Sequence, residues 1–91
     1  MAARFSLGQV VTTPGAINAF SKTGEEPFSF VYRHVAGDWG DLDQEDRMEN
    51  ERSVRQGFRI LSSYRLSDGT KIYIITEADR SSTCILLPEE Y

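Results

Sequence analysis

The sequence predicts a single α+β domain, residues 1–91, in the order β-α-α-α-β-β-β, with an antiparallel sheet meander and helices packed on one face. Helix start and stop signals follow one another up to residue 57, after which the hydrophobic period changes from 3.6 to 2. An Asp-Gly pair then separates two alternating runs, as in a tight hairpin. A chain of 91 residues can bury one core but is too short for two domains of ordinary size.

The first strand and the first helix are predicted near the N-terminus. Residues 5–12 (FSLGQVVT) are apolar and β-branched, with Gly8 marking a bulge, and we expect this strand at an edge of the sheet. Thr13 stands before a proline, where its hydroxyl can cap free backbone N–H groups. A helix is therefore expected over 14–22, with Gly24 ending it. The expected apolar face of this helix consists of Ala16, Ile17 and Phe20.

Two further helices are predicted before the main strands. Pro27 opens the second helix and Gly37 closes it. Its expected buried face has the spacing i, i+3, i+4 and i+7 and consists of Phe28, Val31, Tyr32 and Val35. A third helix is expected over 42–56, with acids early, arginines late and Gly57 beyond, an order that complements the helix dipole. It has few apolar residues, so we expect it to be largely exposed.

Three strands are predicted in the last third of the chain. Residues 58–66 alternate in polarity and predict a half-buried strand. The residues expected on its buried side are Phe58, Ile60, Ser62, Tyr64 and Leu66. After the Asp-Gly turn, a return strand is expected over 71–77 and a last strand over 83–87, which Pro88 stops.

Composition excludes several function classes. Fourteen acidic against ten basic residues give a formal net charge of -4, opposite to the basic footprint of a direct nucleic-acid binder, so no direct nucleic-acid binding is expected. No stretch approaches the roughly 18 apolar residues that span a bilayer, and the N-terminus lacks the apolar run of a secretion signal. We therefore expect a cytoplasmic protein without a membrane partner. The single cysteine, Cys84, is expected to be a buried strand residue.

The most unusual feature is an acidic run, which places half of the fourteen acids within residues 38–51, offset only by Arg47. Spaced carboxylates can engage Arg and Lys clusters, so the run is a candidate docking surface for a basic protein. One alternative is a solvated helix face with i to i+4 pairs, here Asp43 with Arg47 and Glu51 with Arg55. Another is a metal site, although Gly and Glu do not fall where a calcium loop needs them. The candidate partner-binding residues in this run are Asp38, Trp39, Asp41, Asp43, Glu45, Asp46 and Glu49.

Two more features are candidates for recognition. Trp39 lies among glycines and aspartates and is either a plug of the core or an exposed anchor for a partner. The loop 77–83 gathers acids, an arginine and hydroxyls at a hairpin end, where binding groups are often displayed but where turn chemistry uses the same residues. Asp79 and Arg80 are the candidate partner-binding residues of this loop.

No pattern in the sequence predicts catalysis. His34 is the only histidine and, with Cys84, supplies two of the three or four ligands that a zinc site needs. Asp38 can orient it as a general base, but no serine or cysteine nucleophile belongs to a recognisable motif. No glycine-rich loop cradles a phosphate. We therefore expect no catalytic residue, no metal and no cofactor, and His34 is expected to be structural or at the surface.

The segments GDWGDLDQEDRMENERSV, SSYRLSDGTKIYIITEADRSST and LLPEEY resemble a family of small uncharacterised proteins carried on bacterial plasmids and integrative mobile elements. The resemblance covers nearly the whole chain. It implies a setting, mobile DNA in bacteria, and no functional residue, because no activity is attached to that family. Small acidic proteins of such elements are similar in size and charge to inhibitors of host restriction or CRISPR systems.

The function predicted from the sequence is that of a non-enzymatic acidic interaction protein of a bacterial mobile element. Its acidic helix is expected to occlude a basic nucleic-acid-handling or defence protein of the host. One alternative is a small metal-dependent hydrolase or nuclease that uses Asp38, Asp41, Glu77 and Asp79. The other is a structural module that self-associates through a sheet edge.

Overall fold

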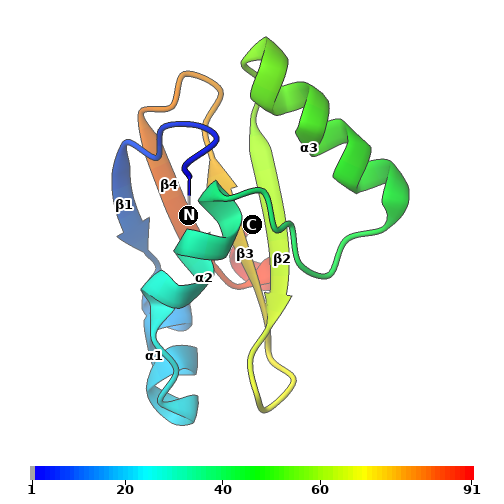
Figure 1. The fold of residues 1–91 in the computed structure, drawn as a ribbon. Coiled ribbons are helices and arrows are strands. Elements are labelled where there is room, and N and C mark those ends of the chain that lie inside the picture. Colours follow the sequence, from blue (N-terminus) through cyan, green and yellow to red (C-terminus); the bar gives the residue numbers. More distant parts are fainter. Residues whose placement is uncertain (1) are drawn as a thin grey trace.

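The computed structural model describes residues 2–91, and it confirms the α+β class and the β-α-α-α-β-β-β order (Figure 1). The elements are β1 Gln9–Thr12, α1 Pro14–Thr23, α2 Pro27–Val35, α3 Gln44–Gln56, β2 Ile60–Arg65, β3 Lys71–Thr76, β4 Ser82–Leu86 and the 3-10 helix η1 Pro88–Glu90. Within residues 2–91, none of the helices is both long enough and apolar enough to cross a membrane.

The sheet is mixed, with the strand order β1-β4-β3-β2. β2, β3 and β4 form the expected antiparallel succession, but β1 pairs in parallel with β4, so that Gln9 lies opposite Ser82 and Thr12 opposite Ile85. The prediction of a purely antiparallel meander is therefore wrong, whereas the edge position of the first strand is confirmed. Tight turns impose antiparallel pairing only on the strands that they join. Three helices separate β1 from the next strand, so no turn determines its direction.

α1 and α2 cover one face of the sheet, and the main core lies between these helices and the strands (Figure 1). Its buried residues are Ala16, Phe20, Phe30, Val31, Tyr64, Leu66, Ile72, Ile74 and Ile85. The residues predicted to be buried from Ile60 to Leu66 are buried, but Ser63 on the opposite side of β2 is buried as well. Phe58 lies before the strand and is exposed. Ile17 is also exposed, because Ala16 and Phe20 lie one turn apart on the side of α1 that meets the core.

The buried face of α2 shares Val31 with the predicted one but differs from it at the other positions. Phe28 and Tyr32 are 45% and 58% exposed, and their rings lie beside each other with 6.0 Å between centroids. Phe30, Val31 and His34 are the buried residues of this helix. The difference arises because hydroxyl groups on the sheet bind the polar side chain of His34, which a count of apolar positions does not register.

His34 belongs to a chain of buried hydrogen bonds that joins α2 to three strands. Its Nδ1 lies 2.6 Å from Ser62 Oγ and its Nε2 lies 2.9 Å from Thr76 Oγ1, which in turn lies 2.7 Å from Thr83 Oγ1. Thr83 donates its proton to the carbonyl oxygen of Leu7. Thr76 must then donate to Thr83 and accept from Nε2–H, so Nδ1 accepts from Ser62. Burial lowers the pKa of the imidazole to about 3, and His34 is therefore a neutral structural residue at pH 7.

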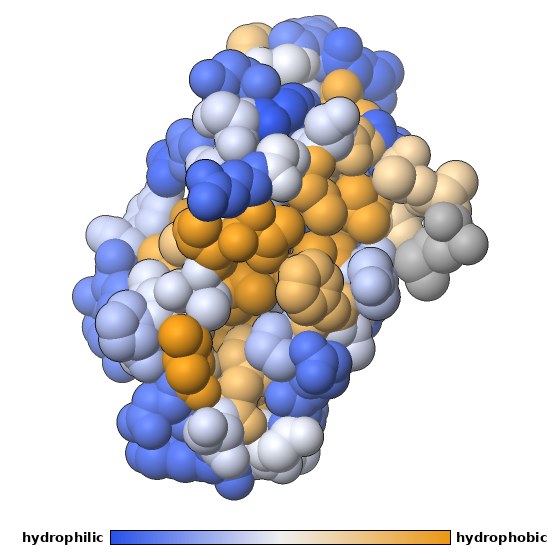
Figure 2. Space-filling view, turned by 90° about the vertical axis from the view of Figure 1, so that its left-hand side faces the viewer, coloured by the Kyte–Doolittle hydropathy of each residue, from blue (hydrophilic) through white to orange (hydrophobic). Residues whose placement is uncertain are grey.

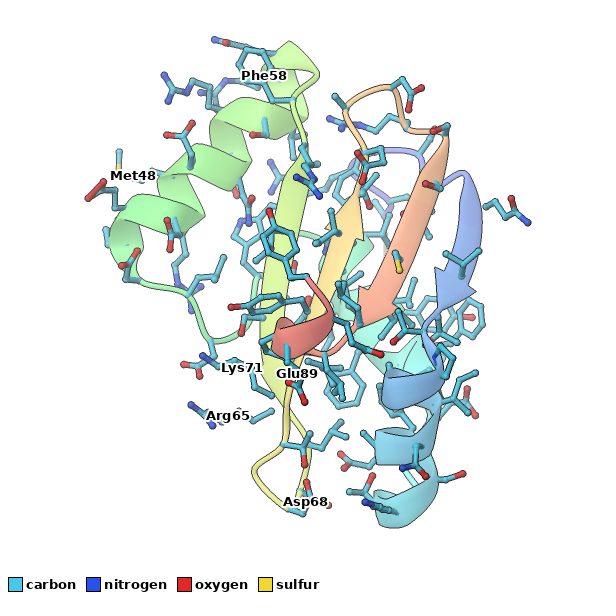
Figure 3. The ribbon with its side chains drawn as sticks, turned by 180° about the vertical axis from the view of Figure 1, so that it is seen from behind. Met48, Phe58, Arg65, Asp68, Lys71 and Glu89 are labelled. Atoms are coloured by element: carbon cyan, nitrogen blue, oxygen red, sulfur yellow. The ribbon has the colours of Figure 1, made fainter. Side chains whose placement is uncertain are left out.

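α3 does not share the face that α1 and α2 cover, so the expectation of all helices on one face is wrong for this helix. It stands beside β2, and Figure 3 shows it next to the opposite face of the sheet, in front of which η1 lies. The Asn50 side chain attaches it by donating to the carbonyl of Leu61 at 2.7 Å and accepting from the Leu61 N–H at 3.3 Å. Its buried residues, Asn50 and Ser53, are polar, and Met48 is exposed. The prediction of a largely exposed helix is confirmed.

The predicted element ends are confirmed where local chemistry determines them. Thr13 Oγ1 accepts a hydrogen bond from the backbone N–H three residues along, and α1 and α3 end at Gly24 and Gly57. β1 begins at Gln9 rather than at residue 5. The reason is that Gly8, with φ of 64°, turns the chain where the backbone of the β3–β4 turn comes close.

The two outer edges of the sheet differ. The edge of β2 is closed by Gly40, which forms a parallel bridge with Ser63. β1 has no further strand beside it within residues 2–91. Figure 2 shows the side of the molecule on which β1 and α1 lie, with apolar residues gathered at its centre, and Val11 of β1 is exposed. Of the two edges, only that of β1 is open to the self-association alternative.

Replacing Gly40 with alanine is expected to destabilise the fold by more than about 1–2 kcal/mol, which is the cost of a left-handed backbone alone. Gly40 has φ of 75°, and a Cβ there would meet the carbonyl oxygen of Ser63 and the ring of Tyr64. Gly69 is the matched control, because its φ is 88° but its Cβ position is open. Urea denaturation should show a larger loss for Gly40→Ala than for Gly69→Ala. Equal losses would contradict the close approach at the β2 edge.

Candidate functional site

Five of the predicted carboxylates lie together at the start of α3 and form what we call the acidic surface. They are Asp41, Asp43, Glu45, Asp46 and Glu49, and all five are exposed. Asp43 is the N-cap of α3, and its Oδ1 accepts from the backbone N–H of Asp46 at 2.8 Å. Acids in the first turn also complement the positive end of the helix dipole. The cap and the dipole therefore offset part of the repulsion among these carboxylates.

The arginine that could neutralise the acidic surface is bound by the backbone instead. Arg47 donates to two carbonyl oxygens of the loop before α3, including that of Leu42 at 2.9 Å. The predicted pair of Asp43 with Arg47 is therefore not formed. Within residues 2–91, Glu45 and Asp46 have no ion-pair partner. The first turn of α3 thus presents two uncompensated carboxylates.

Two other members of the acidic surface carry exposed ion pairs. Asp41 Oδ2 lies 3.1 Å from Arg65 Nε, and Glu49 Oε1 lies 2.6 Å from Arg52 Nη2. All four side chains are half exposed or more. Such pairs contribute little to stability and are weakened by salt. Their carboxylates can therefore exchange an internal partner for an external one.

Glu51, further along α3, stabilises the fold and does not belong to the acidic surface. Its carboxylate accepts from both terminal nitrogens of Arg4 at 2.9 and 2.8 Å, and from the indole Nε1 of Trp39 at 2.9 Å. The hydrogen bonds from Arg4 are the main cause that lowers the pKa of Glu51 to about 2. The predicted pair of Glu51 with Arg55 is replaced by this connection between α3, Trp39 and the N-terminal segment.

Trp39 and Asp38 are predicted partner-binding residues that the structure places outside the acidic surface. Trp39 is 2% exposed, and its ring stacks on that of Phe5 with 6.2 Å between centroids. Trp39 is therefore a buried core residue, which is the first of its two expected roles. Asp38 Oδ2 accepts from Arg33 Nε at 2.8 Å, and this bond is the main cause of its lowered pKa. Asp38 Oδ1 also accepts from the Gly40 N–H, so its carboxylate orders the loop after α2.

Asp79 and Arg80 lie at the β3–β4 turn, where both make structural contacts. Asp79 Oδ1 accepts from the Ser81 N–H at 3.0 Å, and hydrogen bonds from Ser81 lower the pKa of Asp79. Arg80 donates to three backbone carbonyl oxygens, one of them that of Ser53 near the end of α3 at 2.9 Å. The guanidinium therefore ties the turn to the carboxyl end of α3. These two residues are at the opposite end of α3 from the acidic surface.

α3 and the neighbouring face of the sheet border an open groove of about 520 Å³, which we call the α3 groove. α3 and the loop before it form one wall, β2 and β3 form the floor, and Arg59 and Tyr91, which contact each other, also line the groove. The lining residues are Asp41, Leu42, Asp43, Asp46, Glu49, Asn50, Ser53, Arg59, Leu61, Ser63, Lys71, Tyr73 and Tyr91. Figure 3 faces this side of the sheet, with Met48 turned away from the strands and Lys71 at their lower end. The acidic surface is thus also one wall of a concave site.

A buried hydroxyl lies at the floor of the α3 groove. Ser63 is 2% exposed, and within residues 2–91 its Oγ has no hydrogen-bond partner. A buried polar atom without a partner costs about 1–3 kcal/mol. The protein therefore keeps an unfavourable group at a position that lines a groove, which marks Ser63 as a candidate functional residue.

The sequence-based prediction missed the α3 groove and its floor. Leu61 and Ser63 alternate with the buried side of β2, so their place on the opposite face could be read from the period of 2. Tyr73 and Tyr91 approach each other from segments far apart in the chain, with 6.1 Å between ring centroids. Only the position of α3 beside β2 turns this face into a groove, and no local signal encodes that position.

The residues named for the metal-dependent alternative do not come together. Within residues 2–91, no three His, Cys, Asp or Glu side chains are close enough to share a metal ion. Asp38 is bound to Arg33, and Glu77 Oε2 lies 3.6 Å from Arg59 Nε. His34 contacts hydroxyls in the core and not the carboxylate of Asp38. The geometry gives the hydrolase or nuclease alternative no support.

No protein-family model, no curated protein and no solved structure matches this chain. The resemblance to proteins of bacterial mobile elements is therefore still a prediction. A functional interpretation rests on the acidic surface and the α3 groove themselves.

Proposed function

We propose that the chain is a non-enzymatic interaction protein that binds a basic protein partner through the acidic surface. One observation carries this proposal: among the described residues 2–91, Glu45 and Asp46 in the first turn of α3 have no ion pair, while Arg47 is bound to the backbone. Ion pairs at i, i+3 or i, i+4 stabilise a helix, and α3 forms one of them, between Glu49 and Arg52. Neither Glu45 nor Asp46 has a basic residue at those spacings, so the charge of both carboxylates remains available to a partner.

The charge distribution favours a partner that is rich in lysine or arginine. α3 has 13 residues, so the helix offers a face about 20 Å long. Complementary charge accelerates association and excludes partners of the wrong sign. The exposed pairs of Asp41 and Glu49 are weak, so partner cations can replace Arg65 and Arg52 at small cost.

The proposed mode of action is occlusion. Proteins that handle nucleic acids bind phosphates with clustered Lys and Arg side chains. Carboxylates on α3 compete for the same side chains by charge-assisted hydrogen bonds. The setting implied by the resemblance, mobile DNA in bacteria, makes a host nucleic-acid-handling or defence protein, such as a restriction or CRISPR protein, the proposed class of partner.

Neutralising the first turn of α3 is expected to abolish partner capture. The test variant combines Glu45→Gln with Asp46→Asn and leaves Asp43 in place, because that carboxylate caps the helix. The control variant combines Asn18→Lys with Ser21→Lys on the exposed side of α1, which changes the net charge by the same two units. From a bacterial lysate, the wild type and the control should capture a basic protein, with capture weakened by salt, and the test variant should not.

The captured protein is then purified, and its binding to nucleic acid is measured with and without the chain. Competition by the wild type and the control, but not by the test variant, supports occlusion. Recovery of the same proteins by the test variant, or recovery of no protein by any bait, would show that the acidic surface is only a solvated helix face.

A further inference from the structure

The α3 groove contains an unsatisfied acceptor next to a wall of carboxylates. Ser63 lines the groove, and its buried Oγ has no hydrogen-bond partner among residues 2–91. A hydroxyl has two acceptor lone pairs and one donor. On the wall beside it, Asp46 lines the groove and has no ion pair within residues 2–91. Both groups can accept hydrogen bonds from a cationic group in the groove.

The floor of the groove suits the stem of a long basic side chain. Leu61 and Tyr73 line it, and methylene stems of lysine and arginine pack against such apolar surface while the charged end reaches polar groups. The lining of the groove contains four carboxylates and two cations, so its formal charge is negative. Of the two cations, Arg59 lies 3.6 Å from Glu77 and 5.3 Å from the ring centroid of Tyr91, and Lys71 lies at the start of β3.

We propose that the α3 groove receives one lysine or arginine side chain of the basic partner. Its stem lies on Leu61 and Tyr73, and its charged end donates to Ser63 Oγ and to the carboxylate of Asp46. This inference rests on the proposed function and adds to it a specific pocket and an anchor. The occupant is a protein side chain because the groove is open and continuous with the acidic surface, which meets the rest of the partner.

The test measures the affinity of the full chain for a hexalysine peptide by calorimetry. Ser63→Ala and Asp46→Asn are each expected to weaken binding about tenfold, since each removes a hydrogen bond to a charged group. Glu45→Gln is the comparison within the acidic surface, because Glu45 is the neighbour of Asp46 and carries the same charge but does not line the groove. It is expected to weaken binding about twofold, clearly less than Asp46→Asn, because it removes one exposed charge and no contact inside the groove.

A second readout separates binding from folding. Ser63→Ala removes a buried hydroxyl without a partner, so its melting temperature should equal or exceed that of the wild type while its affinity falls. A lower melting temperature with lower affinity would assign Ser63 a structural role and overturn the inference.

Two further outcomes keep this inference distinct from the proposed function. If the peptide binds, Ser63→Ala has no effect, and Asp46→Asn and Glu45→Gln weaken binding equally, then the acidic surface docks cations without the groove. The groove inference is then overturned and the proposed function stands. If the wild type does not bind the peptide at all, the groove inference is also overturned, and lysate capture decides the proposed function separately.

Discussion

Lowering the pH from 7 to 5 is expected to reduce the free energy of unfolding by about 2 kcal/mol through His34 alone. The imidazole is fully buried, and its pKa in the folded protein is about 3, against 6.5 for the free side chain. Because the folded pKa lies below the unfolded one, the unfolded chain binds the proton first as the pH falls. The contribution of neutral His34 is fully present above pH 6.5 and is lost progressively toward pH 3, in total about 5 kcal/mol.

Urea denaturation of the wild type and His34→Gln at pH 7, 6 and 5 tests this prediction. Glutamine can bond to the hydroxyls of Ser62 and Thr76 but does not titrate. The variant should be less stable at pH 7 and nearly independent of pH down to 5. Glu51 does not affect the comparison between pH 7 and 5. The pKa of its carboxylate is about 2 in the folded protein and 4.5 in the unfolded chain, so its contribution to stability is lost only below about pH 4.5. An equal pH dependence in both proteins would contradict the burial of a neutral histidine.

Trp39→Ala is expected to reduce the free energy of unfolding by about 3–5 kcal/mol, as for other large aromatic residues removed from a core. Trp39 is 2% exposed, contacts the rings of Phe5 and His34, and donates to Glu51. Small domains have about 5–15 kcal/mol of stability in total. The variant should therefore show a much lower urea midpoint than the wild type.

Trp39→Phe is the control for this prediction. It keeps an aromatic ring in the core and loses the hydrogen bond to Glu51, so a smaller loss is expected. An exposed partner anchor would behave in the opposite way, because its removal would weaken partner binding and leave stability unchanged. Wild-type stability in Trp39→Ala would therefore contradict the assignment of this residue to the core.

The helix ends and the hairpin were predictable because each depends on residues a few positions apart. The hydroxyl of Thr13 reaches the N–H groups of its own helix, and Gly24 and Gly57 occupy positions at helix ends. The Asp-Gly turn brings β2 and β3 together, and the alternation in β2 already separates the buried Ile60 and Tyr64 from the opposite face.

The face of α2 could not be predicted from its apolar spacing. The spacing favours Phe28 and Tyr32, but the structure buries His34, because Ser62 and Thr76 from two different strands satisfy both of its ring nitrogens. Burial of a polar residue depends on partners that are distant in the chain. The same holds for Trp39 and Glu51, whose roles depend on Arg4 and Phe5.

The charge of the acidic surface could be predicted from the sequence, but its ion pairs could not. Its charge is visible in the sequence, but the predicted pairs of Asp43 with Arg47 and of Glu51 with Arg55 are not formed. The loop before α3 engages Arg47, and the N-terminal segment engages Glu51. Tertiary contacts therefore decide the partners of Arg47 and Glu51, whereas the sequence already shows that Glu45 and Asp46 have no basic residue three or four positions away.

The sequence by itself determined the α+β class, the order of the elements, the helix caps and the concentration of acids at the start of α3. The tertiary structure alone decided the parallel pairing of β1 with β4, the buried face of α2 and the α3 groove with Ser63 at its floor. The physical reason is the range of the interactions. Caps, turns and periodicity act within a few residues, whereas strand neighbours, buried hydrogen bonds and concave surfaces depend on segments that only the folded chain brings together.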